Sequence, residues 1–210
     1  MKPYFVKTPR LLKFFFKHWV WGFSKKEKVL YLTFDDGPTP EITEWTLNVL
    51  DKYNAKATFF CIGKNSQEHP EIYQKIIAKN HAIGNHTNNH LNGLKTSDSA
   101  YFENIDRCSK HFNKNPDLKL FRPPYGKISL SQARLIRKKG YKIIMWDVLS
   151  ADFDTKITNE KCLENVIRNT ENGSIIVFHD SLKASEKLKY VLPKIVEYYT
   201  HKGFLFKKIT

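Results

Sequence analysis

The sequence is poor in cysteine and has no repeat or linker that would divide it into domains. Both absences narrow the class of protein. Its 210 residues include only Cys61, Cys108 and Cys162, which lie far apart and form no Cys-x-x-Cys pair. An odd, scattered set argues against a disulfide framework and against a thiolate zinc site, so we expect three small core residues. Internal repeats, low-complexity tracts and Pro/Gly/Ser-rich linkers are also missing. A chain of this length with 41% hydrophobic residues can bury one sizeable core.

Acidic residues are scarce relative to basic ones. The sequence has 35 Lys+Arg against 21 Asp+Glu, a formal net charge of +14. Such an excess attracts nucleic acid, anionic lipid or acidic glycans, or it only solvates a lysine-rich surface. Zinc-finger spacing, an aromatic motif of the RNA-recognition type and a basic region leading into heptads are all absent. We therefore expect no nucleic-acid partner.

Residues 1–27 form an aromatic and basic arm ahead of residues 28–210. Apolar residues recur in it at helical spacing, namely Leu11, Leu12, Phe15, Phe16, Trp19, Val20 and Phe23. Lys13, Lys17 and His18 interrupt the stretch, which has no small-residue cleavage site and is too short and too charged to span a bilayer. The stripe predicts a helix that packs on one end of the fold or lies in a membrane interface through residues 11–23. We accordingly expect a cytoplasmic or membrane-peripheral protein.

Short apolar runs alternate with amphipathic stretches along the rest of the chain. Strands are predicted at 29–34, 57–62, 81–84, 118–121, 141–146, 174–178 and 204–206. Helical patterns cover 41–53, 70–79, 97–112, 129–139, 159–170 and 186–201. This alternation indicates an α/β fold with right-handed crossovers and a mostly parallel sheet, either open or closed.

Two adjacent carboxylates, Asp35 and Asp36, follow the first predicted strand, and Gly37 allows the chain to turn sharply after them. Neighbouring residues of an extended chain point to opposite sides. One carboxylate can therefore bind a metal while the other faces a substrate as a base. Asp-Asp-Gly-Pro is also ordinary turn chemistry, which is the structural interpretation of the same residues.

A pair of histidines, His86 and His90, follows another predicted strand end. At i and i+4 they would lie on one face of a helical turn, close enough to share a metal ion. With one carboxylate they make a set of two imidazoles and one carboxylate, which is typical of a catalytic zinc-type site with an open position. Iron, cobalt, nickel and manganese suit the same ligands.

Five motifs follow one another in the chain. They are Thr33-Phe34-Asp35-Asp36-Gly37, His86-Thr87-x-x-His90, Arg122-Pro123-Pro124-Tyr125-Gly126, the segment from Trp146 to Phe153, and Ile176-Val177-Phe178-His179-Asp180. Together they resemble the motifs of the NodB-type polysaccharide deacetylases, carbohydrate esterase family four. The resemblance implies a single-domain distorted (β/α) barrel of about seven strands over residues 28–210. In such folds the catalytic residues converge at the carboxyl ends of the strands.

The resemblance also implies a reaction and its residues. The reaction is hydrolysis of N-acetyl groups on N-acetylglucosamine units of peptidoglycan or a chitin-like glycan, with release of acetate. Asp36, His86 and His90 would hold one divalent metal ion, zinc in the first instance and cobalt, nickel or manganese as alternatives. The remaining roles would be Asp35 as base, His179 as acid, Arg122 and Asp152 as residues that orient the base and the acid, and the backbone N–H of Tyr125 as oxyanion donor.

Substrate contacts are implied for Pro123, Pro124, Tyr125, Phe153 and Val177. The fourth motif of the family usually ends Asp-Trp, where this chain has Asp152-Phe153. The fifth usually has Leu two residues before its histidine, where this chain has Val177. Both replacements keep the pocket wall apolar, so a small acyl group still fits.

Other interpretations use the same residues. The site suits an O-acetyl esterase acting on acetylated xylan, or a catalytically inactive glycan-binding barrel, although the latter would be expected to have lost a site residue. Arg122 could form a structural ion pair, and His179 could be a hydrogen-bonded core histidine. Asp147, Asp154 and Asp180 compete with Asp152 as the partner of His179.

Overall fold

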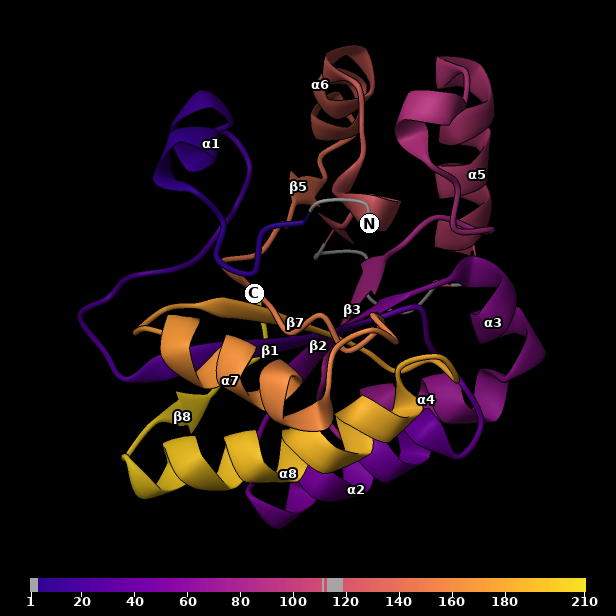
Figure 1. Ribbon diagram of the computed structural model, residues 1–210. Helices are drawn as coiled ribbons and strands as arrows, with labels where there is room; N and C mark the ends of the chain where they lie inside the picture. The colour runs from indigo at the N-terminus through magenta and orange to yellow at the C-terminus, as the bar shows by residue number, and fades with distance from the viewer. Residues whose placement is uncertain (1–3, 111, 113–118) are drawn as a thin grey trace.

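The fold is a curled parallel sheet covered by helices, and the computed structural model describes residues 4–110, 112 and 119–210 of it (Figure 1). Seven strands pair in the order β5-β4-β3-β2-β1-β7-β6, and β8 pairs with the start of β1. Their bounds are β1 Val29–Asp35, β2 Ala57–Cys61, β3 Ala82–Asn85, β4 Leu120–Phe121, β5 Lys142–Ile143, β6 Val148–Leu149, β7 Ile175–His179 and β8 Leu205–Phe206. Because β5 and β6 stay unpaired edges in this order, the predicted barrel of about seven strands is confirmed as an open half-barrel.

Helices cover the sheet in two groups. Helices α2, α4, α7 and α8 lie together along one face, and α5 and α6 stand beside the other end of the sheet (Figure 1). Their bounds are α1 Arg10–Phe15, α2 Ile42–Lys52, α3 Gly63–Glu68, α4 Pro70–Ala78, α5 Asp98–Lys110, α6 Leu130–Lys138, α7 Asn159–Asn169 and α8 Ser185–His201.

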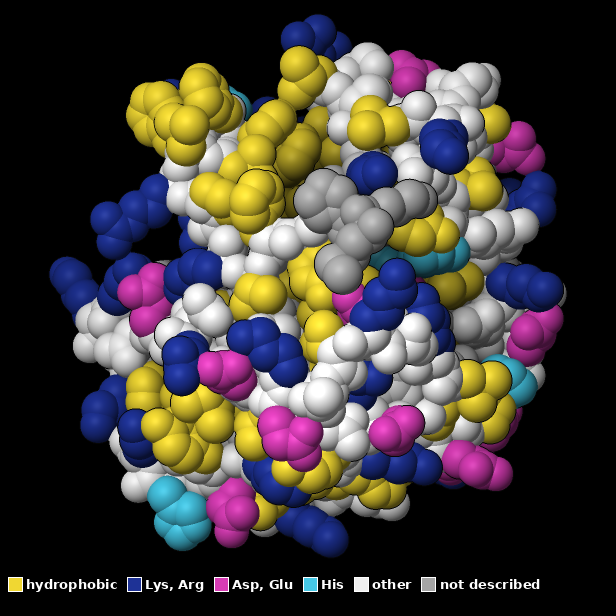
Figure 2. All heavy atoms as spheres, viewed as in Figure 1, with side chains coloured by type: hydrophobic (Ala, Val, Ile, Leu, Met, Phe, Trp, Pro, Cys, Tyr) yellow, Lys and Arg dark blue, Asp and Glu magenta, His cyan; other side chains and the backbone are white. Residues whose placement is uncertain are grey.

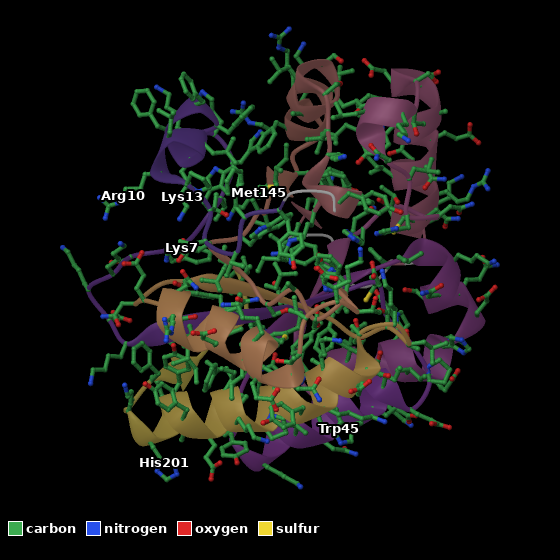
Figure 3. All side chains as sticks on the ribbon, in the orientation of Figure 1. Lys7, Arg10, Lys13, Trp45, Met145 and His201 are labelled. Atoms are coloured by element: carbon green, nitrogen blue, oxygen red, sulfur yellow. The ribbon has the colours of Figure 1, made fainter. Side chains whose placement is uncertain are left out.

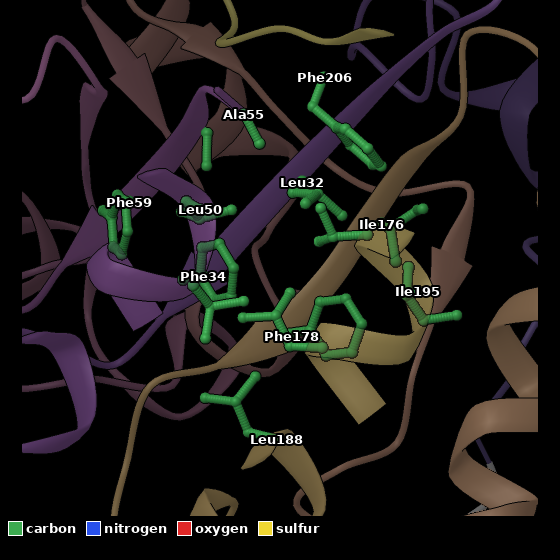
Figure 4. Packing of buried hydrophobic residues seen from close by; sticks show 14 of the residues in the cluster. Leu32, Phe34, Leu50, Ala55, Phe59, Ile176, Phe178, Leu188, Ile195 and Phe206 are labelled. Carbon is green, nitrogen blue, oxygen red and sulfur yellow. The ribbon is translucent and has the colours of Figure 1, made fainter. Parts of the chain in front are cut away.

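The strand alternation decides which side chains reach the core and which reach the concave side. Successive side chains of a strand point to opposite faces. In β1, Leu32 and Phe34 pack in the main core with Phe178 and Ile176 of β7 (Figure 4). The intervening residues of both strands, Asp35 among them, therefore face the inside of the half-barrel.

Some predicted elements differ from the observed ones. The strand predicted at 141–146 ends at Ile143, because Val20 of the arm then bonds to the Ile143 carbonyl and to the Met145 N–H before the chain reaches β6. The strand predicted at 81–84 is β3, shifted by one residue, and α3 has no counterpart in the helical patterns. Leu118 of the strand predicted at 118–121 lies outside the described residues. All three cysteines are buried and free.

The amino-terminal arm runs between the two edge strands of the half-barrel. Lys7 forms an antiparallel bridge to Val148 of β6, and Val20 forms a parallel bridge to Ile144 just after β5. Its helix, α1, ends at Phe15 and is shorter than the aromatic stripe predicts. Residues 16–19 after the helix form a turn and a bend. The partly buried side chains of the arm pack on two apolar clusters, Leu12, Phe16 and Trp19 on one and Val20 and Phe23 on the other.

Ion pairs at a buried carboxylate attach the arm to the sheet. Lys7 Nζ lies 2.6 Å from Asp147 Oδ2, and Lys13 pairs with the other oxygen. Burial raises the pKa of Asp147, but hydrogen bonds from Lys13, Lys7 and Ser174 outweigh it and lower the pKa below its usual value. The base of α1 is thus held in place (Figure 3). None of the helices in the described part of the chain is long and apolar enough to cross a membrane.

Candidate active site

Two strand ends bring a carboxylate and an imidazole together on the concave side. Asp35 ends β1, and His179 ends β7 as its partner in the parallel register. Both lie on the face opposite the main core, because Phe34 and Phe178, which precede them, point into that core. The motifs that contain Asp35 and His179 therefore meet at the carboxyl ends of two neighbouring strands, although they lie 144 positions apart in the chain.

The guanidinium of Arg122 is buried beneath these strand ends. The Arg122 side chain is fully buried and donates from Nη1 to Asp35 Oδ1 at 2.7 Å and to Thr33 Oγ1 at 2.7 Å. Its Nε and Nη2 donate to the carbonyls of Ile144 and Met145 at 3.1 and 3.0 Å. The guanidinium is thus satisfied on three sides, and it keeps the Asp35 carboxylate in one orientation.

Asp36, His86 and His90 form a cluster that fits a metal ion. One ligand atom from each of the three lies within 4.8 Å of the others. Asp36 Oδ1 is 3.2 Å from His90 Nε2 and 3.6 Å from His86 Nε2. That oxygen is buried, and no residue in the described ranges donates a hydrogen bond to it. A buried carboxylate oxygen facing two imidazole nitrogens is the donor set of a transition-metal site.

The protonation of this cluster also suits a metal. Burial lowers the pKa of His86 to about 4, so its imidazole is neutral at pH 7. His86 Nδ1 lies 2.8 Å from the carbonyl oxygen of Arg122, to which it can donate, and this leaves Nε2 free on the side of Asp36. Burial raises the pKa of Asp36, but the imidazoles of His90, His179 and His86 outweigh it, so that the pKa lies below the usual range.

The two histidines meet through a loop, and the predicted helical turn is wrong. Residues 86–90 form no helix, and Thr87 and His90 have φ of 62° and 56°. The backbone N–H groups of Asn88 and Asn89 both donate to Asn104 Oδ1 of α5, at 2.8 and 2.9 Å. This distant amide therefore stabilises left-handed backbone that a non-glycine residue seldom adopts.

His179 has a strong carboxylate partner in Asp152. Its Nδ1 lies 2.7 Å from Asp152 Oδ1, and its backbone N–H donates to Asp152 Oδ2 at 2.7 Å. Burial lowers the pKa of His179, but the charge and hydrogen bond of Asp152 outweigh it and raise the pKa to about 10. The other candidates are engaged elsewhere, Asp147 with the arm and Asp154 with the Tyr4 hydroxyl.

Asp180 has a structural contact that the sequence pattern did not reveal. Its Oδ1 accepts from the Gly37 N–H at 3.0 Å and its Oδ2 from the Thr43 hydroxyl at 2.5 Å. Burial raises the pKa of Asp180 to about 8. Gly37 is required by this approach and not, as expected, by a sharp turn of its own, because the positive φ of 82° belongs to Asp36.

These groups open into a cavity of about 1030 Å³. Asp35, Asp36, His86, His90 and His179 line it, together with most of the predicted substrate contacts, namely Pro123, Tyr125, Phe153 and Val177. The exception is Pro124, which is buried and lies outside the lining. Lining residues that sequence reasoning missed are Tyr4, Asn65, Lys95, Lys127, Trp146, Leu149, Leu182 and Lys183. Trp146 and Leu149 belong to the fourth motif, where the sequence analysis gave them no role, and the others lie outside the five motifs.

Tyr125 occupies a strained position at the rim of the cavity. It lies in a 3₁₀ turn, Pro124–Gly126, with φ 60° and ψ 9°. Its hydroxyl is 3.1 Å from His90 Nδ1. Within the described ranges, the neighbouring N–H groups of Gly126 and Lys127 donate to backbone carbonyls, whereas that of Tyr125 does not. A left-handed residue with an unused N–H at a cavity rim suits an oxyanion donor.

Known proteins share this fold and much of the sequence. The family model described as polysaccharide deacetylase matches residues 23–144. A peptidoglycan-N-acetylglucosamine deacetylase of Bacillus cereus is 32% identical over 192 residues, 90% of each chain. A chitooligosaccharide deacetylase of Azorhizobium caulinodans is 31% identical over 166 residues, 78% of this chain and 79% of the relative. The crystal structure of a peptidoglycan N-acetylglucosamine deacetylase superposes with a TM-score of 0.88 at 30% identity, covering 96% of this chain and 95% of that one.

The shared half-barrel and the match over more than half of the chain define the class. This protein belongs to the polysaccharide deacetylase family.

The contact between Gly37 and Asp180 generates a prediction about stability. A Cβ at Gly37 would lie 2.0 Å from Asp180 Oδ2, so Gly37→Ala should lower the free energy of unfolding by about 1–3 kcal/mol. In an Asp180→Ala background the oxygen is gone, and the same substitution should cost clearly less. Urea unfolding of the four proteins of this double-mutant cycle measures the difference. An equal cost in both backgrounds would show that the clash is not the reason for the glycine.

Proposed function

We propose that this enzyme removes N-acetyl groups from N-acetylglucosamine units of a glycan and releases acetate. The observation that carries the proposal is the placement of Asp36, His86 and His90 beside Asp35 and His179 in one cavity. The names of the Bacillus cereus and Azorhizobium caulinodans relatives support the substrate class. In this assignment one divalent metal ion, with zinc the first candidate, is held by the carboxylate and two imidazoles.

Each residue then has a step that its contacts suit. A metal in this site would make water a stronger nucleophile by lowering its pKa toward about 7. Asp35, oriented by Arg122, takes a proton from the water that attacks the acetamide carbonyl. The oxyanion accepts a hydrogen bond from the Tyr125 N–H. As the C–N bond breaks, His179 donates a proton to the leaving nitrogen, and Asp152 stabilises its imidazolium.

The cavity rim indicates a glycan that carries negative charge. Lys95, Lys127 and Lys183 line the cavity and are exposed, and none of them has a carboxylate within 4 Å in the described residues. Among the residues that the structure describes, Asp35 and Asp36 are the only acidic residues of the lining. Peptidoglycan strands carry carboxylates on their stem peptides, or on the lactyl group where no peptide is attached, whereas chitin-like chains are uncharged. Unpaired cations at the rim therefore favour peptidoglycan.

Acetate release decides among the candidate substrates. We expect activity on peptidoglycan and N-acetylglucosamine oligomers, greater on the former, when the enzyme is supplied with zinc, cobalt or manganese. Deacetylation of acetylated xylan alone would replace the proposal by the O-acetyl esterase alternative. Failure on every acetylated glycan, with glycan binding retained, would leave the inactive glycan-binding barrel.

Metal content tests the three assigned ligands. His86→Ala and His90→Ala should each lose the bound divalent ion and, with it, acetate release. Asp35→Asn should retain the metal and lose turnover, because a general base contributes about 10²–10⁴-fold. Elemental analysis and zinc titration calorimetry of the purified variants measure both effects, and melting temperatures check that each variant is folded. Metal lost from Asp35→Asn would mean that the two carboxylates have exchanged roles.

Amide and ester substrates distinguish a general-acid role of His179 from a structural one. An amine hardly leaves without a proton, whereas the phenoxide of an aryl acetate leaves unaided. His179→Ala should therefore lose about 10²-fold or more in kcat/KM on an N-acetylglucosamine oligomer and much less on an aryl acetate. A parallel loss on both substrates would assign His179 a structural role.

The alkaline limb of the pH profile tests the contact between Asp152 and His179. The raised pKa keeps His179 protonated at neutral pH, so activity that needs the acid is present below this pKa and lost as the pH rises through it. Asp152→Asn removes the negative charge and should move the alkaline limb of kcat to lower pH. Asp154→Asn, two residues away and bound to Tyr4, is the matched control and should not shift it. An unshifted limb in Asp152→Asn would contradict the pairing.

A further inference from the structure

Helix α1 exposes three large apolar side chains on one short segment. Leu11, Phe14 and Phe15 are 66%, 72% and 69% exposed. No residue of α1 is buried. The space-filling view shows an apolar projection at the upper left, where Figure 1 places α1 (Figure 2). We call these three residues the apolar tip. A contiguous exposed apolar group of this kind marks an interaction surface.

The apolar tip is held rigidly by the structure beneath it. Lys13, on the same helix, pairs with the buried Asp147, and so does Lys7. After the helix, Phe16 stacks on Trp19 with ring centroids 4.5 Å apart, and both belong to the apolar cluster around Trp21. The tip therefore projects from an anchored base. The packing that anchors the arm leaves the tip itself uncovered in the described part of the molecule.

The chain segment that carries the tip has basic residues and no acidic ones. The first 26 residues contain seven Lys or Arg and no Asp or Glu. Arg10 and Lys17, which flank the helix, are exposed, and neither has a carboxylate within 4 Å in the described residues. Figure 3 shows Lys7, Arg10 and Lys13 along the lower side of α1. Apolar side chains bordered by unpaired cations match a surface with an apolar interior and an anionic face.

We propose that the apolar tip docks on an anionic lipid bilayer, with Leu11, Phe14 and Phe15 inserted at the interface and Arg10 and Lys17 at the headgroups. A bilayer supplies both the apolar layer and the negative charge. A second copy of the chain would bring two arms of like charge together, which the absence of acidic residues in this segment opposes. The docked arm also lines the cavity through Tyr4, so binding holds the active site close to the membrane surface.

Vesicle co-sedimentation tests the docking. The 210-residue protein should bind vesicles of phosphatidylcholine with about 30% phosphatidylglycerol, because this composition makes the surface potential strongly negative. Added salt should weaken the binding. The triple variant Leu11→Ser, Phe14→Ser, Phe15→Ser should bind at least about tenfold more weakly, because three apolar side chains no longer leave water. Its acetate release on a soluble oligomer should stay unchanged, since none of the three residues lines the cavity.

Matched controls separate the tip from general stickiness and general charge. Leu205→Ser removes an apolar side chain of similar exposure, 61%, on β8 and should bind normally. Arg10→Gln with Lys17→Gln should lose anionic selectivity about tenfold, whereas Lys52→Gln with Lys189→Gln, on exposed positions of α2 and α8, should not.

Two results would overturn the docking. The first is equal binding of the wild type and the triple variant to anionic vesicles. The second is a concentration-dependent dimer in sedimentation velocity that the triple variant abolishes, with no vesicle binding by the wild type. That outcome would make the tip an interface between copies of this chain.

Discussion

The buried guanidinium of Arg122 is the interaction on which the rest of the site depends. It contacts Asp35 at the end of β1 and two carbonyls of the segment that links β5 to β6. Burial lowers the pKa of Arg122, and the Asp35 carboxylate is its compensating charge. Leaving such a cation without its partner would cost about 3–5 kcal/mol. The folded state therefore keeps the Asp35 carboxylate paired and fixed in one orientation, as a general base requires. The contact between Arg122 and Asp35 therefore both stabilises the fold and orients the base.

Much of the site could be predicted because it follows from strand periodicity. Asp35 and His179 end their strands at residues that alternate with core phenylalanines, so both must face away from the helices. Motif residues at the ends of parallel strands then converge without further information. The family resemblance assigned roles to them, and the structure brings Asp36, His86 and His90 to one point as that resemblance implied.

The features that could not be predicted depend on partners that are far away in the chain. The loop at 86–90 has a left-handed Thr87 followed by two N–H groups that donate to Asn104, and local spacing suggested a helical turn instead. Gly37 is explained only by Asp180, which lies 143 positions further on. The strand predicted at 141–146 is interrupted because Val20 of the arm takes the hydrogen bonds of the Ile143 carbonyl and the Met145 N–H. In each case tertiary contacts override a local pattern. The cavity rim follows the same rule, since Lys95 and Lys183 come from loops with no sequence signature.

The position of the arm between the edge strands has a consequence for how the chain folds. Its bridges join Lys7 to Val148, Val20 to Ile144 and Gly22 to Ser174, so each contact spans well over a hundred residues. Contacts of such long sequence separation are slow to form, because a large loop must close before they stabilise anything. During synthesis the aromatic arm emerges before these partners, and its bridges cannot all form until Ser174 has left the ribosome. Until then its tryptophans and phenylalanines are open to other apolar surfaces, including chaperones.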